Sequence, residues 1–288
     1  MTASGLPKGI ALANLGGGQW GFKGFTAKAG TYLVTVKATM NGRTVSQRLA
    51  LQVAGLPAWA KGTFNGAVHN GAVYEEYPTG IATFTVSSAG KISGKFSEYG
   101  TNWTFSASRY TDCAADFSAY SLAATAKYAY KVKSGKKTVT KYLTRKLTLT
   151  VLPSEFGGTA VIEADDGLHA DFRQNLWGSA YKALGKQLFY ASKKVQYRTY
   201  KVDALGTGDL SLKITPAGAV TATLTWDTGK KDKKKNAIIY KPTCATALLP
   251  ESAATTSPDA FEGCIPVYFP PSPANNFPGY AAFWMFPF

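Results

Sequence analysis

GIATFTVSSAGKISGKF, residues 80–96, aligns without gaps with GDLSLKITPAGAVTATL, residues 208–224. Small or apolar residues alternate with polar residues in both copies, which is typical of strands that bury one face. An Ala-Gly pair follows the first strand of each copy, and its glycine can supply the positive φ of a tight turn. We therefore expect two related antiparallel hairpins, each with one buried face.

Strand-like stretches continue on both sides of this repeat, and no helical periodicity interrupts them. The further expected strands lie at 103–108, 120–133, 138–151, 159–163, 195–202, 237–248 and 279–286. Because closing or stacking a sheet removes its exposed edges, residues 57–288 are predicted to form an antiparallel β-barrel or β-sandwich. Two related halves, about 61–153 and 154–288, would build it, so the fold class is all-β.

Residues 1–56 are expected to form a separate module. Alternating apolar residues at 31–53 flank Asn41-Gly42, which is a strong hairpin turn signal. The motifs GLPKGI at 5–10 and AGTYLVTV at 29–36 resemble bacterial immunoglobulin-like domains. We expect this module to be incomplete, because the chain begins where such a domain would already be under way. The resemblance implies a spacer or adhesive role and no catalysis.

The rest of the chain resembles a repeat found near the C-terminus of large secreted bacterial surface proteins. The motifs that carry this resemblance are GTFNG at 62–66, the stretch 80–96, QNLW at 174–177, and YFPP at 268–271 with FPGY at 277–280. The resemblance implies a location that is secreted or on the bacterial cell surface, and it implies no particular activity.

The chain is strongly basic, with a formal net charge of +15 over 288 residues. Lysines gather near expected turns at 133–137, 193–201 and 230–235. Such charge can attract an anionic glycan or an acidic surface, and it can also simply keep hairpins soluble. Nucleic acid is an unlikely partner because no known binding module is present. No apolar run approaches the roughly 18 residues of a membrane-spanning helix, so we expect no membrane span.

Two sets of residues suggest local sites. Cys244 and Cys264 flank a Pro/Ser/Thr-rich segment, and a disulfide between them would close a loop of about 20 residues. The acidic turn at 163–171 offers Asp165, Asp166 and Asp171 as oxygen ligands for calcium. A turn rich in Asp and Gly at a strand end explains the same residues without a metal, and we expect no other cofactor.

Aromatic residues near expected loops are the candidates for ligand binding. They are Tyr74, Tyr77, Trp103, Trp177 and Tyr181. Planar rings beside polar groups suit the recognition of sugars, and packing in a core is the alternative fate of the same rings. Two histidines and scattered acids, without a nucleophile motif, predict that the protein is not an enzyme.

The sequence therefore predicts a non-enzymatic structural or adhesive module of a secreted bacterial surface protein. Two alternatives stay open. One is a carbohydrate- or host-glycan-binding module that uses loop aromatics and lysines. The other is a fibre or lattice subunit whose partners are other surface modules or copies of itself.

Overall fold

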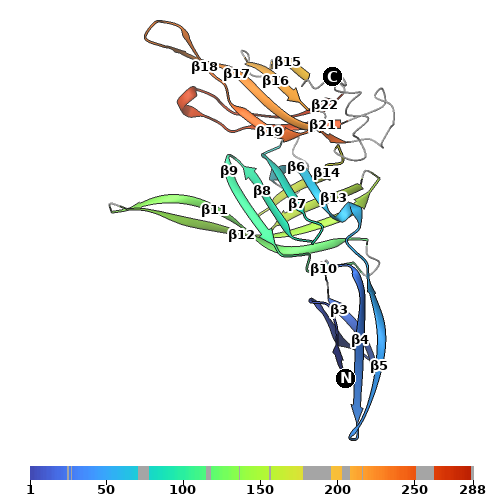
Figure 1. The fold of residues 1–288 in the computed structure, drawn as a ribbon. Helices are drawn as coiled ribbons and strands as arrows, with labels where there is room; N and C mark the ends of the chain where they lie inside the picture. The colour runs from blue at the N-terminus through green and yellow to red at the C-terminus, as the bar shows by residue number, and fades with distance from the viewer. Residues whose placement is uncertain are drawn as a thin grey trace.

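A computed structural model describes residues 1–24, 26, 28–70, 78–114, 118–135, 137–155, 157–177, 196–202, 208–215, 217–250 and 263–286. The described elements are β-strands and short 3-10 turns, so the protein is all-β. Figure 1 shows three bodies in a row: the N-terminal hairpins at the bottom, a barrel in the middle and a C-terminal β unit at the top.

The middle body is a closed antiparallel barrel of eight strands. In sheet order they are β11 (Tyr120–Ser134), β12 (Lys137–Ser154), β13 (Gly157–Ala164), β14 (Leu168–Gln174), β6 (Gly62–Asn70), β7 (Gly80–Val86), β8 (Ile92–Glu98) and β9 (Thr101–Ala107). The short strand β10 (Asp112–Cys113) pairs with the start of β11. Closure leaves no free strand edge around most of the barrel, which agrees with the closed or stacked sheet predicted from the sequence.

Side chains fill the barrel interior. Alternate residues of every strand point inward, and the rings of Phe64 and Phe84 stack with centroids 4.6 Å apart. Phe172 meets Phe84 edge-on at 4.9 Å. Rings packed in these geometries contribute to stability beyond the area they bury. The barrel is a packed core, and its outer surface is what it presents to other molecules.

The two aligned stretches form hairpins with the same turn. In β7–β8, the Gly90 amide donates to the Ser87 carbonyl at 2.9 Å, and Ser87 Oγ accepts from the Lys91 amide. The equivalent turn joins β16 (Gly208–Ile214) to β17 (Ala219–Lys231), where the Gly218 amide donates to the Thr215 carbonyl at 2.9 Å. Both glycines have positive φ, as the sequence predicts.

The C-terminal unit has its own core. Its larger sheet pairs β15 (Gln196–Val202), β16, β17, β18 (Ala237–Tyr240) and β19 (Thr243–Ala247). A second sheet pairs β20 (Leu249–Pro250), β21 (Gly263–Phe269) and β22 (Tyr280–Phe286). Leu210, Leu212, Leu224 and Val220 of the larger sheet are buried in one core with Phe269 of β21 and with Phe277, which lies between β21 and β22.

The structure corrects the expected boundary between the halves. Strands β13 and β14 lie after residue 153, yet they pair with β12 and β6 inside the barrel. The barrel therefore runs to Gln174, and the second aligned hairpin belongs to a different sheet. Local alternation of residues shows which face of a strand is buried, but it does not show which strand lies beside it.

QNLW at 174–177 joins the barrel to the C-terminal unit. The Gln174 side chain accepts from the Gly158 amide at 2.8 Å and donates to the Ala58 and Lys61 carbonyls. Three residues later, Trp177 is buried in the C-terminal core, and its Nε1 donates to the Leu248 carbonyl at 3.0 Å. This short segment thus places one side chain that hydrogen-bonds to the backbone in each of the two bodies.

The N-terminal module consists of two small sheets. One pairs β1 (Thr2–Ser4), β4 (Gly30–Met40) and β5 (Arg43–Val53), and the other pairs β2 (Ile10–Gly16) with β3 (Gln19–Gly24). The β4–β5 turn at Asn41-Gly42 has positive φ at both residues, which confirms the hairpin predicted there.

Candidate functional site

The barrel has a seam between β9 and β11. These strands share one residue pair, Thr104 with Lys127, whereas β8 and β9 pair along their full length. At the pair, Thr104 Oγ1 donates to the Lys127 carbonyl at 3.4 Å, which is a long hydrogen bond. The ladder is therefore interrupted along β11 between Lys127 and the two residues, Tyr120 and Ser121, that β10 covers.

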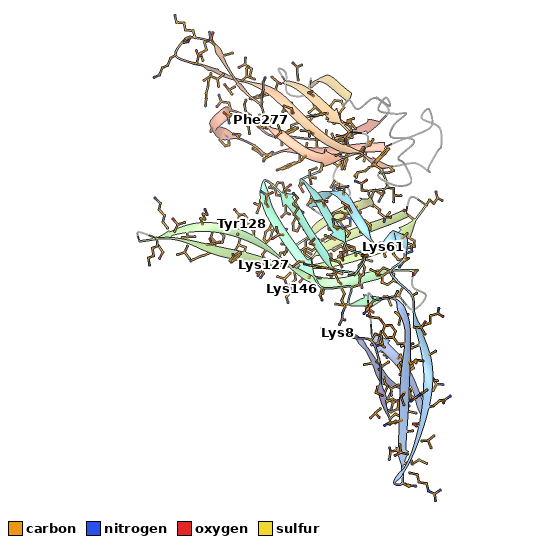
Figure 2. All side chains as sticks on the ribbon, in the orientation of Figure 1. Lys8, Lys61, Lys127, Tyr128, Lys146 and Phe277 are labelled. Atoms are coloured by element: carbon orange, nitrogen blue, oxygen red, sulfur yellow. The ribbon has the colours of Figure 1, made fainter. Side chains whose placement is uncertain are left out.

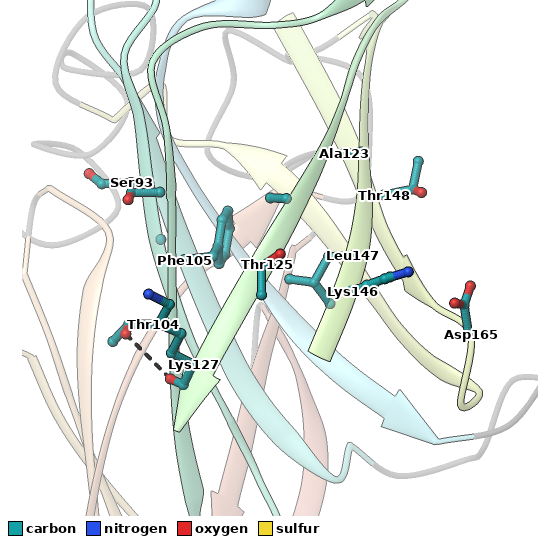
Figure 3. Close-up of a pocket in the computed structure, with 13 residues that line it drawn as sticks. Ser93, Thr104, Phe105, Ala123, Thr125, Lys127, Lys146, Leu147, Thr148 and Asp165 are labelled. Atoms are coloured by element: carbon teal, nitrogen blue, oxygen red, sulfur yellow. Dashed lines mark hydrogen bonds between the residues drawn. The ribbon is translucent and has the colours of Figure 1, made fainter. Parts of the chain in front are cut away.

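A groove of about 940 Å³ follows this seam, and Figure 3 shows the side chains around it. Its floor includes the buried side chains of Phe105 and Leu147. Lys127, Lys146 and Asp165 stand at its rim. Hydroxyl groups supply most of the remaining polar lining, from Ser93, Thr104, Ser106, Thr125 and Thr148. The groove offers hydroxyls and ammonium groups around an apolar floor, which suits binding of a polar ligand.

Beyond the groove, β11 and β12 continue as a long two-stranded hairpin. We call residues 127–146 the arm. Figure 1 shows the arm projecting away from the barrel, toward the same side as the β17–β18 hairpin. Its strands stay paired to the tip, where Ser134 meets Lys137. The arm is thus an ordered extension of the barrel wall.

The register gives the arm two different faces. One face, which we call the lysine face, carries Lys127, Ala129, Lys131 and Lys133 on β11 and Thr138, Thr140, Tyr142, Thr144 and Lys146 on β12. The other face carries Tyr128, Tyr130 and Val132 beside Val139, Lys141 and Leu143. Side chains alternate between faces along a strand, so the two sets point in opposite directions. The hairpin was predicted from the sequence but its division into two faces was not, although the alternation of residues along both strands indicates it.

The arm is positively charged, and neighbouring acidic residues in the sequence do not neutralise this charge. Residues 127–146 hold eight Lys and Arg residues, and the chain has no Asp or Glu between Asp116 and Glu155. Within the described part of the chain, the ion pairs of the arm all involve Arg145. The described lysines of the arm are therefore available to an anionic ligand. Figure 2 shows their side chains extending from the strands, with Lys127 and Lys146 labelled at the root.

Arg145 fixes the root of the arm to the barrel. Its Nη1 lies 2.6 Å from Glu98 Oε2, and its Nε lies 2.8 Å from Asp166 Oδ2. Its guanidinium also lies 4.7 Å from the centre of the Trp103 ring, a cation–π distance. Glu98 is buried, so this pairing satisfies a carboxylate that would otherwise be costly to bury.

The predicted aromatic binding residues do not form a site in the described structure. Trp103 is buried in the barrel core, where its ring stacks on Phe96, and Trp177 is buried in the C-terminal core. Both rings therefore pack in a core, which was the alternative to ligand binding in the sequence analysis. Tyr74, Tyr77 and Tyr181 lie outside the described residues.

The predicted calcium ligands are not brought together. Asp166 pairs with Arg145, and Asp171 Oδ2 lies 3.2 Å from His169 Nε2. Asp165 lies at the rim of the groove. No group of three His, Cys, Asp or Glu side chains suited to a metal occurs in the described parts of the chain.

The predicted disulfide between Cys244 and Cys264 is absent, and both side chains are described as thiols. Cys244 packs in the main C-terminal core, while Cys264 belongs to a small cluster with Ala247 and Leu249. The prediction was wrong because sequence spacing does not determine which cluster a buried cysteine joins, and a disulfide needs a specific geometry. Burial raises the pKa of the Cys244 thiol, which keeps it protonated and poorly reactive.

Searches against protein-family models, curated proteins and solved structures returned no match. Among the described residues, no helix is long and apolar enough to cross a membrane.

Proposed function

We propose that this protein is a non-enzymatic adhesive or structural module of a secreted bacterial surface protein. The projecting arm is the observation that carries the proposal. A ribbon of twenty residues, anchored at its root by Arg145, projects away from the barrel and stays paired to its tip. Such an extension is suited to contact with another surface.

The rest of the molecule supports the same reading. Aromatic side chains fill the barrel interior, so the barrel acts as a rigid base for the arm. The two other bodies lie at opposite sides of the barrel in Figure 1, which leaves the arm clear of both. The resemblances seen in the sequence, to surface modules at both ends of the chain, are the reason for proposing a secreted protein.

Shortening the arm tests this function. Ala129 and Tyr142 are register partners, so Asn-Gly can replace residues 130–141 and close the hairpin with a two-residue turn. We expect the shortened protein to keep its barrel spectrum by circular dichroism and to lose adhesion to immobilised cell-surface material. Unchanged adhesion, or turnover of a substrate in a hydrolase panel, would contradict the proposal.

Self-assembly is a second candidate, favoured by the other face of the arm. Val139 and Leu143 are 43% and 51% exposed there, and Tyr128 stacks on Tyr130 beside them. Exposed apolar rows on a β-ribbon can pair with a second copy of the chain. Light scattering over a concentration series distinguishes the candidates, because a subunit of a fibre grows in mass and a simple adhesin stays monomeric.

A further inference from the structure

We propose that the lysine face of the arm, together with the seam groove at its root, binds a linear anionic polysaccharide. This inference rests on the proposed adhesive function and names its ligand class. The track combines ammonium groups, hydroxyl groups and one exposed aromatic ring on a single continuous face.

The charges form a single row along β11. Lys131 and Lys133 are two residues apart, so their side chains leave the strand about 7 Å from one another on the same face. Lys127 continues the row toward the barrel, and Lys146 stands beside it on β12. A row of ammonium groups with no ion-pair partner among the described residues, interrupted once by Ala129, attracts a ligand whose charges also repeat along a chain.

A neutral, hydroxyl-rich row runs beside the charged one. Thr138, Thr140 and Thr144 lie opposite Lys133, Lys131 and Lys127 in the register. Tyr142, between two of these threonines, is 61% exposed. Threonine hydroxyls can donate to and accept from sugar hydroxyls, and an exposed ring offers an apolar surface to the face of a sugar.

The track continues without a break from the arm into the groove. Thr125 is the register partner of Lys146, and Ala123 is the partner of Thr148, so these residues share the lysine face. From Lys133 to Ala123 the strand spans roughly 33 Å, at about 3.3 Å per residue. That length accommodates an oligosaccharide of several sugars, one end of which would enter the groove above Phe105.

These features favour a polysaccharide over nucleic acid. Single-stranded nucleic acid is held largely by a series of aromatic rings on which successive bases stack. The lysine face presents one such ring, Tyr142, and its β12 residues from Thr138 to Thr144 are neutral. A duplex presents two charged backbones, whereas three of the four lysines of the lysine face lie on a single strand, β11. Spaced anionic groups between hydroxylated rings match the arrangement better.

The test compares two variants that remove equal charge from opposite faces of the arm. Lys131→Gln with Lys133→Gln alters the lysine face, and Lys137→Gln with Lys141→Gln alters the other face. The probe is a heparin oligosaccharide, titrated by calorimetry at low salt against the full chain. We expect about a tenfold loss of affinity for the first variant, since it removes two ion pairs with the ligand, and less than a twofold loss for the second.

Two further measurements sharpen the assignment. Tyr142→Ala is expected to weaken heparin binding severalfold while leaving the net charge unchanged, which general attraction between charges would not produce. Neutral dextran is expected not to bind, and a single-stranded DNA oligonucleotide is expected to bind more weakly than heparin. Equal losses for the two lysine variants, or tighter binding of the DNA, would overturn the inference.

The outcome also separates this inference from the proposed function. If shortening the arm abolishes adhesion while heparin binding is absent in the wild-type protein, the adhesive function stands and the ligand class is wrong. If adhesion survives the shortened arm, the proposed function itself fails.

Discussion

Replacing Gln174 by leucine should destabilise the barrel strongly, because one buried amide satisfies three backbone groups. Its Oε1 accepts from the Gly158 amide at 2.8 Å, and its Nε2 donates to the Ala58 carbonyl at 2.8 Å and to the Lys61 carbonyl. The side chain thus ties β13 to the 3-10 turn η1 (Ala58–Ala60) that precedes β6. Leucine has a similar volume and can make none of these bonds.

The magnitude follows from counting the lost bonds. Three hydrogen bonds at about 1 kcal/mol each give roughly 3 kcal/mol, and leaving the buried Gly158 amide without an acceptor adds about 1–3 kcal/mol. We therefore expect Gln174→Leu to lower the free energy of unfolding by about 4–6 kcal/mol. Urea unfolding followed by far-UV circular dichroism measures this change, and hydrogen exchange at the Gly158 amide reports it locally.

Two controls make the result specific. Arg173→Gln changes the neighbouring residue on the outer face, where its side chain makes one long contact of 3.5 Å to a carbonyl, and should shift stability by less than about 0.5 kcal/mol. Gln174→Glu keeps an acceptor for Gly158 but turns a carboxylate oxygen toward two carbonyls, so it should be more stable below about pH 4 than at neutral pH. A loss below about 1 kcal/mol for the leucine variant would refute the reasoning.

Three other predictions follow from the barrel. An alanine at Gly94 would place its Cβ 2.3 Å from the Phe105 ring, so Gly94→Ala should cost about 1–3 kcal/mol in urea unfolding, and a neutral result would contradict the packing. Burial raises the pKa of the Tyr110 hydroxyl, so the folded state favours the protonated side chain. The stabilisation that this side chain gives is therefore complete below about pH 10 and is lost as the pH rises further. Tyr110→Phe, which loses a 2.8 Å bond to the Ala60 carbonyl, should be about 1 kcal/mol less stable at pH 7 and should show a smaller alkaline loss, both measured by urea unfolding. Amides at 123–126, along the interrupted ladder, should exchange with deuterium faster than those of β13, and equal protection would refute the seam.

Much of the local structure could be predicted from the sequence. The alternation at 80–96 and 208–224 predicted buried faces that the structure confirms, with Phe84, Val86, Leu212 and Ile214 at most 1% exposed. The turns at Asn41-Gly42 and Ser134-Gly135 were also predictable. These features depend on neighbouring residues, since a strand alternates its side chains and a tight turn needs residues that tolerate positive φ.

The candidate site was only partly predictable. The long hairpin and the lysines at 133–137 were identified from the sequence. Trp103 and Trp177, however, were predicted to be ligand-binding rings. Whether a tryptophan near a strand end is exposed depends on what covers it, and here Arg145 and Phe96 cover Trp103. The exposure of Trp103 depends on side chains from other strands, so composition and spacing alone do not predict it.

By itself, the sequence determined the all-β class, the positions of the main hairpins and the face that each strand buries. Only the tertiary structure decided which strands are neighbours: β6 lies beside β14, about a hundred residues away in the chain, and β9 meets β11 at a single pair. It also decided that Cys244 and Cys264 stay apart and that Arg145 joins Glu98 to Asp166. The physical reason is that alternation specifies a face through local geometry, whereas neighbours and closure depend on packing between distant segments of the chain.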